Sequence, residues 1–242
     1  MRWAALVASA LALALALAGC ETTAEKSAKL EREAGKHVTR AQAGLSIKRA
    51  SAYVKVLGEV IVRSREGAAA AVTLRNTSSR TLLEVPIAIT VTDAEGRTLF
   101  ENNAPGLEGA LVSIPSLPAH DEFTWVDDQL PPSDAAAAVL ARVGEAASSS
   151  AALPVMGIAG VHLTEDPTNG VGAAGTVTDR SPVAQRKLVV FGVARRAGRI
   201  IAAGRAVLPE VAAGASVAFQ LFFIGDPRGA QLAMSAPATT FG

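Results

Sequence analysis

The 242-residue chain lacks the cysteine and histidine clusters that hold most metal sites and disulfide frameworks. It has one cysteine, Cys20, and three histidines, His37, His120 and His162, which lie far apart in the sequence. An exported protein that relied on disulfides would carry an even number of cysteines. Neither Cys-x₂-Cys nor His-x₃-His spacing occurs, so a zinc site is not expected. We therefore predict no metal and no cofactor.

Motifs that signal catalysis are also missing. The chain has no Gly-x-Ser-x-Gly, no Gly-x-Gly-x-x-Gly and no phosphate-binding loop. A glycine-rich stretch at 169–175 leads into a strand pattern rather than a helix, so it lacks a phosphate-binding helix N-terminus, and we predict a hairpin turn with a flexible edge. The pairs Asp127-Asp128 and Glu165-Asp166 lack the dense oxygen ligands of a calcium loop. We predict that the protein is not an enzyme and assign no catalytic residue.

Excess charge of either sign is absent. Lys and Arg number 23 and Asp and Glu number 22, which gives a formal net charge of +1. A nucleic-acid-binding protein needs a basic surface, so nucleic acid is excluded as a partner. At 50% hydrophobic residues, the composition is that of a globular protein rather than a disordered one.

The one long apolar run lies at the N-terminus. One positive charge at Arg2 precedes a 15-residue run from Trp3 to Leu17, and charged residues return at Glu21. A transmembrane helix needs about 20 apolar residues, so this run is too short for a comfortable span. Leu and Ala alternate in it, but both are apolar, so the alternation does not indicate a half-buried strand. The pattern predicts a secretory signal peptide over residues 1–19.

The end of that run, Leu17-Ala18-Gly19-Cys20, resembles the bacterial lipobox. The resemblance implies cleavage between Gly19 and Cys20 and attachment of fatty acyl chains, such as palmitate, at Cys20. Two chains suffice for stable anchoring. Cleavage would remove one basic residue, Arg2, leaving 22 basic against 22 acidic residues. The expected location is extracytoplasmic, on the outer face of the cell membrane or on an outer membrane. The alternative is an ordinary secretory signal with a chance cysteine.

Residues 20–45 form a charged, alanine-rich segment. Helix-forming residues dominate 24–36, but Leu30 is the only large apolar residue there, so little surface can be buried. We predict a tether that is transiently helical. The alternative is a helix that packs on a partner or on the rest of the chain.

From Leu45 onward the apolar pattern has a period of two residues. Val54, Val56, Val60 and Val62 are predicted to share one face of a strand, and short strands with regular turn signals follow. This combination indicates an all-β sandwich or barrel.

The second half of this region repeats the first. The turn at 76–78 matches 179–181 at an offset of 103 residues. A repeat of about 100 residues indicates two tandem domains. We place them at 46–145 and 152–242, with a boundary at 145–151, where small residues predict a flexible connection. The same comparison predicts a strand at 139–143, although the local composition favours a helix.

One segment of the first repeat has no counterpart in the second. Residues 117–125 match 211–219 at an offset of only 94, so the first copy is about eight residues longer and 102–110 is the insertion. Loops on a rigid sandwich commonly carry binding, so we predict a recognition loop here. The residues assigned to it are Asn102, Asn103, Pro105, Gly106, Leu107 and Glu108. Trp125 matches Phe219 and is predicted to be core, the alternative being an exposed carbohydrate platform.

The repeat resembles a family of bacterial envelope modules, immunoglobulin-like sandwiches with an FxLYD-type motif. Residues 89–93 and 191–195 occupy the motif position, where Asp93 and Phe191 match and the Tyr is absent from both copies. The turns at 76–78 and 213–214 also fit the family pattern. The resemblance implies two tandem immunoglobulin-like β-sandwich domains with non-enzymatic binding or spacer roles, and it transfers no catalytic residue.

These observations together predict a lipid-anchored, extracytoplasmic binding or spacer protein of the bacterial cell envelope. Its expected contacts are the membrane, through the lipid, and an unidentified envelope protein or glycan. Two alternatives stay open. One is an assembly factor that pairs a sheet edge with a partner strand, and the other is an envelope hydrolase with no recognisable motif.

Overall fold

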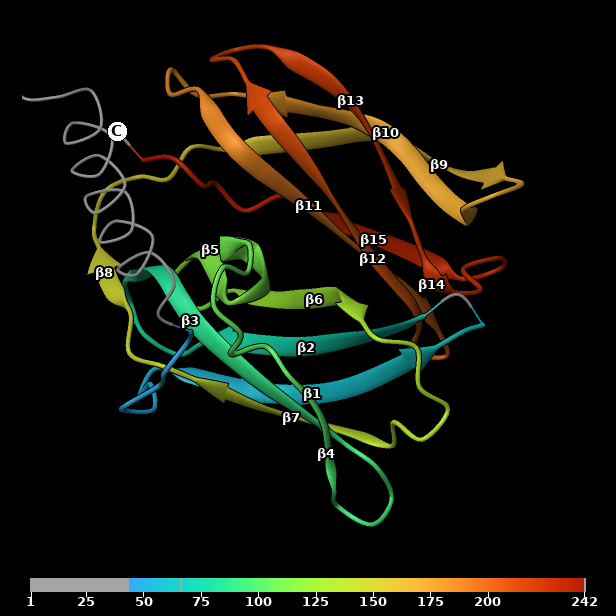
Figure 1. Ribbon diagram of the computed structural model, residues 1–242. Coiled ribbons are helices and arrows are strands. Elements are labelled where there is room, and N and C mark those ends of the chain that lie inside the picture. Colours follow the sequence, from blue (N-terminus) through green and yellow to red (C-terminus); the bar gives the residue numbers. More distant parts are fainter. Residues whose placement is uncertain (1–43, 66, 242) are drawn as a thin grey trace, which may run out of the picture. The chain divides into compact units, whose positions relative to one another are not determined.

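The computed structural model describes residues 44–65 and 67–241, which form antiparallel β-sheets without any α-helix in those ranges (Figure 1). The predicted all-β fold is therefore confirmed. The predicted signal peptide, Cys20 and nearly all of the tether lie outside the described residues. Within the described ranges, no helix is long and apolar enough to span a bilayer.

The first repeat consists of two sheets. One has the strand order β1-β2-β6, and in the other β3 pairs with β4, β5, β7 and β8. The strands are β1 (Val54–Arg63), β2 (Ala68–Asn76), β3 (Thr81–Thr92), β4 (Thr98–Glu101), β5 (Ser113–Leu117), β6 (Glu122–Leu130), β7 (Ala138–Val143) and β8 (Ala147–Ser149). The strand predicted at 139–143 is confirmed as β7. Part of the predicted flexible connection at 145–151 is β8, which pairs with β3.

The second repeat has the same pairing order. Strands β9-β10-β13 correspond to β1-β2-β6, while β11 pairs with β12 and β15 as β3 pairs with β4, β5 and β7. The strands are β9 (Met156–Asp166), β10 (Gly170–Asp179), β11 (Gln185–Arg196), β12 (Arg199–Val211), β13 (Ser216–Phe222), β14 (Ile224–Gly225) and β15 (Gln231–Ser235). The repeat found in the sequence is therefore a repeat of strand topology.

Equivalent turns keep the same local chemistry. The side-chain Oδ1 of buried Asn76 accepts a hydrogen bond from the Ser78 backbone N–H at 2.9 Å, and Oδ1 of buried Asp179 accepts one from the Ser181 N–H at 2.8 Å. This bond of a side chain to the backbone two residues on fixes the turn. The equivalence extends to the backbone conformation. Glu84 and Lys187, which are 103 residues apart, both have a φ of 49°, a left-handed conformation that residues other than glycine rarely adopt.

A β-bulge overturns the prediction that Val54, Val56, Val60 and Val62 share one face. The pairing of β1 with β2 shifts between Val56 and Gly58. Directly paired residues lie on the same face of a sheet, and faces alternate along a strand. Before the shift Val56 pairs with residue 74, and after it Val60 pairs with residue 71, so the valines are divided between the two faces. The extra residue at the bulge reverses the alternation.

Strand β11 is buried on both faces, which joins the two repeats through a common core. Its alternate residues Leu188, Val190 and Ala194 pack with β10 and β13 of the second repeat. The intervening Val189 and Phe191 pack instead with residues of the first repeat. Four layers result: the β3 sheet, the β1-β2-β6 sheet, the β11-β12 sheet and the β9-β10-β13 sheet (Figure 1).

The facing surfaces of the two middle layers are built from small and apolar side chains. Ala69 and Ala71 of β2, which pair with Val62 and Val60 of β1, are 0% exposed. At the same junction Phe123 and Phe191 meet edge to face, with ring centroids 5.1 Å apart. Such pairs stabilise beyond their buried area by about 0.5–1.5 kcal/mol. One of the two core clusters therefore contains residues of both repeats, so the repeats are not joined only through a linker.

A row of paired residues distinguishes the inner sheet of the first repeat from the outer sheet of the second. In the first repeat the row is Val60, Ala71 and Val126, and it belongs to the shared core. The equivalent row in the second repeat is His162, Ala174 and Gln220, in which His162 and Gln220 are exposed.

The glycines at 170–175 lie in a central strand, which corrects their assignment to a flexible edge. Strand β10 pairs with β9 on one side and β13 on the other. A Cβ at Gly172 would lie 2.4 Å from the Leu221 carbonyl oxygen, and a Cβ at Gly175 would lie 2.9 Å from the Phe219 ring. These glycines allow close approach of neighbouring groups.

Candidate functional site

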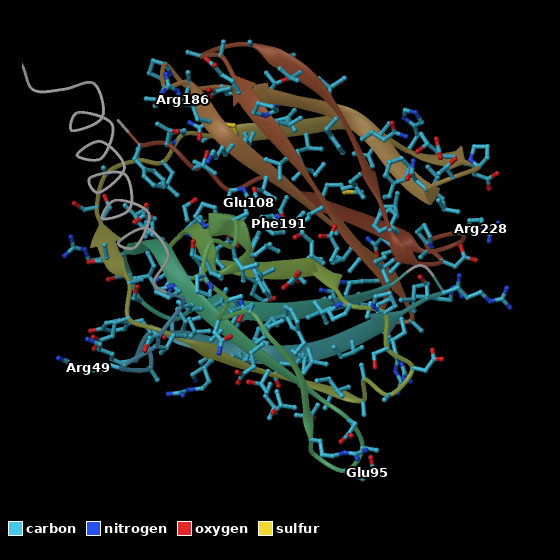
Figure 2. All side chains as sticks on the ribbon, viewed as in Figure 1. Arg49, Glu95, Glu108, Arg186, Phe191 and Arg228 are labelled. Carbon is cyan, nitrogen blue, oxygen red and sulfur yellow. The ribbon has the colours of Figure 1, made fainter. Side chains whose placement is uncertain are left out.

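A buried ionic cluster joins the two repeats. The Arg205 guanidinium of β12, only 3% exposed, donates through Nε to Asp128 Oδ1 at 2.9 Å and through Nη1 to Glu108 Oε2 at 3.2 Å. The Arg205 backbone N–H also donates to Asp128 Oδ2 at 3.0 Å. Glu108 is labelled in Figure 2, where it lies between the two halves of the described structure. A buried arginine needs such partners because its charge has lost its hydration.

Asp127 lies beside this cluster without a direct bond to the arginine. Asp127 is 1% exposed, and its side-chain Oδ1 accepts a hydrogen bond from the Gln129 backbone N–H at 3.0 Å. Burial raises the pKa of Asp127 to about 6, while the Gln129 N–H and the positive charge of Arg205 act in the opposite direction. Burial also raises the pKa of Asp128, although the contacts with Arg205 oppose this rise. The Asp127-Asp128 pair is thus part of the junction between the repeats.

The predicted recognition loop is anchored by its first residue. Asn102 is fully buried, and its Oδ1 accepts the Ile89 N–H at 2.7 Å. Its Nδ2 donates to the carbonyl oxygens of Ile87 at 3.0 Å and Leu111 at 2.7 Å. Asn102 therefore serves the fold, and a ligand at this loop would have to contact other residues.

The remaining loop residues differ in their exposure. Asn103, Pro105 and Gly106 are exposed and form the tip, and Asn103 Nδ2 donates to the Glu101 carboxylate at 2.8 Å. Leu107 and Glu108 are half-buried. The loop closes in a single 3₁₀ turn, η1 (Gly109–Leu111).

Trp125 is a core residue, as predicted. It is 0% exposed, and its indole Nε1 donates to the Ala110 carbonyl oxygen at 2.7 Å. An exposed carbohydrate platform at this position is excluded. The same hydrogen bond fastens the end of the predicted loop to the core.

The loop opens on a groove shared with the second repeat. The groove has a volume of about 260 Å³ and is lined by Glu108, Gly109 and Ala110 from the loop and by Arg186 and Lys187 from β11, with Phe241 near the C-terminus. Arg186 is labelled in Figure 2 on the side of the second repeat. The structure thus places the end of the predicted loop beside two cationic side chains that sequence patterns did not connect with it.

The two histidines within the described residues do not form a site. His37 lies outside the described residues, His120 is an exposed turn residue with φ of 59°, and His162 is exposed on β9 with Nδ1 2.9 Å from the Gly160 carbonyl oxygen. No group of three His, Cys, Asp or Glu side chains in the described ranges could hold a metal ion. Asp166 instead caps a turn, and the N–H groups of Asn169 and Thr168 lower its pKa.

Arg205 is the junction residue that the sequence analysis missed. Its surroundings, Ala-Ala-Gly-Arg-Ala-Val, contain a single charged residue within an apolar strand. A charge in such a run predicts either an exposed position or a buried partner, and this signal was available. Gly19 and Cys20, the predicted cleavage and lipid-attachment residues, lie outside the described residues.

Comparisons with known proteins identify no family. Neither a scan against protein-family models nor a search of curated proteins gives a match for this chain.

Proposed function

We propose that the protein is a lipid-anchored, extracytoplasmic binding or spacer protein of the bacterial cell envelope, without enzymatic activity. In this proposal Cys20 carries the lipid, residues 20–45 act as the tether, and two immunoglobulin-like sandwiches present loops and grooves. The observation that carries the proposal is the common core of the two repeats, together with the bond of Glu108 to Arg205, which fixes the 102–110 loop against β12. A rigid support of this kind suits a loop that binds, because less ordering entropy is lost on binding.

The lipid anchor is tested by Cys20→Ser in a bacterial host. The variant is expected to leave the membrane fraction and to lose incorporation of labelled palmitate. Thr22→Ser is the matched control, because it changes a neighbouring residue outside the lipobox, and it should behave as the unmodified protein does. If Cys20→Ser stays in the membrane fraction as fully as the control does, the anchor is wrong.

Binding and spacer roles are separated by crosslinking in living cells. A photo-crosslinking residue at Pro105 reports on the exposed loop tip, and one at Leu140, 58% exposed on β7, is the control. A specific adduct from position 105 alone supports binding through the loop. No adduct from either position supports the spacer role.

The edge strand β9 supports a second candidate function, assembly by strand pairing. It is 11 residues long, and its pairing within the described residues is with β10 alone. Unpaired edges are templates for partner strands. The bulge at Gly160, where φ is 66°, interrupts this edge and divides it into two regular parts, Met156–Ala159 and His162–Asp166. Leu163→Lys should abolish such pairing, measured by co-purification of the partner, and leave folding intact.

A further inference from the structure

A second groove lies where β1 of the first repeat meets the turn between β11 and β12. Its volume is about 720 Å³, within the range of small-molecule sites. The groove is separate from the 102–110 loop and from the buried ionic cluster, and neither of the functions considered above uses it.

The hollow arises from small residues in register across one sheet. Gly58 of β1 pairs with Thr73 of β2, which pairs with Thr124 of β6. A Cβ at Gly58 would meet no atom within 4 Å, and the same is true of Gly198 in the opposing turn. The hydroxyls of Thr73 and Thr124 lie 3.1 Å apart at the polar floor.

Two arginines give the groove its charge. Arg195 is half-buried and donates through Nη2 to Thr124 Oγ1 at 3.2 Å, and Arg199 is exposed in the turn. No carboxylate among the described residues forms an ion pair with either guanidinium. Arginine presents a planar set of donors that matches the oxygens of a carboxylate or a phosphate.

The acidic residues nearest the groove are already engaged. Glu122 lines the groove but forms an ion pair with Arg75. Glu59, between Gly58 and Val60 on β1, accepts the backbone N–H of Ala141 in β7 through Oε1. The charges of Arg195 and Arg199 are therefore left uncompensated.

The wall beside these charges is apolar. The bulge in β1 places Leu57 outward, so that 47% of it is exposed, and Val60 and Ile200 complete the wall. A solvent-exposed leucine between a polar floor and two guanidinium groups that lack an ion-pair partner favours a ligand that has both an anionic head and an apolar portion.

We propose that this groove binds a small amphiphilic anion, a carboxylate or phosphate ester with a short apolar chain. The anionic head lies against Arg195 and Arg199, and the apolar chain lies along Leu57, Val60 and Ile200. The proposal does not depend on lipid attachment at Cys20 or on the role of the 102–110 loop.

The test is isothermal titration of the full chain, in a neutral maltoside detergent, with n-butyl phosphate, pentanoate and inorganic phosphate. Saturable binding of butyl phosphate or pentanoate is expected, tighter than that of inorganic phosphate. Whichever amphiphile binds more tightly identifies the head group. Arg199→Gln removes one exposed guanidinium, and Arg195→Gln/Arg199→Gln removes both. Each charge-assisted bond lost should weaken binding by about tenfold or more.

Two further variants make the result specific to the groove. Gly58→Phe fills the hollow from a position where an added Cβ meets nothing, so it should block binding without unfolding the sheet. Arg80→Gln/Arg142→Gln removes two exposed arginines elsewhere and should leave the affinity unchanged. The proposal is overturned if neither amphiphile binds saturably, if inorganic phosphate binds as tightly as both, or if Arg199→Gln and the control variant bind alike.

Discussion

Replacing Asp127 by Asn should stabilise the protein at neutral pH but not in acid. Burial raises the pKa of this carboxyl from 3.8 to about 6. The folded state therefore binds a proton more tightly than the unfolded state does. Stability falls as pH rises from 3.8 to about 6, because the unfolded chain gives up this proton first, and it levels off above that range. The cost above pH 6 is ~3 kcal/mol.

Asparagine removes that cost because it carries no charge. It keeps an oxygen for the Gln129 N–H, but its amide group also needs a partner, which offsets about 1 kcal/mol. The expected net gain is therefore ~2 kcal/mol in free energy of unfolding at about pH 8, and close to zero or slightly negative at about pH 4. Urea unfolding followed by circular dichroism at both pH values measures the difference.

Asp134→Asn changes an exposed aspartate just beyond the end of β6 and should shift stability equally little at both pH values. If Asp127→Asn lowers stability at about pH 8 by more than it does at about pH 4, the charged form of Asp127 is favourable in the folded state. Burial at the junction would then not be what determines the pKa of Asp127.

Three other substitutions test the junction and the loop anchor by chemical unfolding. Arg205→Leu should cost about 3–5 kcal/mol, because it leaves the Asp128 charge buried without its partner, and restored stability in Arg205→Leu/Asp128→Leu would support this cause. Trp125→Phe should cost ~1–3 kcal/mol by leaving the Ala110 carbonyl without its donor, and an unchanged unfolding midpoint would contradict it. Asn102→Ala removes three buried hydrogen bonds and should cost more than Trp125→Phe; the opposite order would show that the loop is not anchored there.

The topology of the two repeats could be predicted from sequence because turn residues are local signals. Asn76 and Asp179 fix equivalent turns with their own side chains, so the match at an offset of 103 residues was visible without any tertiary information. The bulge in β1 was missed although Gly58 stands at it, and an isolated glycine inside a strand pattern is a signal for a bulge. Period-two counting fails at any such position.

The common core was harder to predict, although a signal existed. A strand buried on both faces has a nearly continuous apolar run, and residues 188–194 of β11 have one. The alanine run of β2 is similar. Neither apolar run indicates which other part of the chain covers the second face of its strand. The ionic cluster has the same limitation, because Arg205 and Glu108 are 97 residues apart and meet only through the packing of the repeats.

The layering also determines which surface could extend the series of repeats. The contact between the repeats joins unlike surfaces, and a contact of unlike surfaces that does not close on itself can in principle propagate into a filament. The surface that would receive a third repeat is the outer sheet of the second. There His162 and Gln220 are exposed where the first repeat has Val60 and Val126. These exposed polar side chains disfavour burial of the outer sheet against a further repeat.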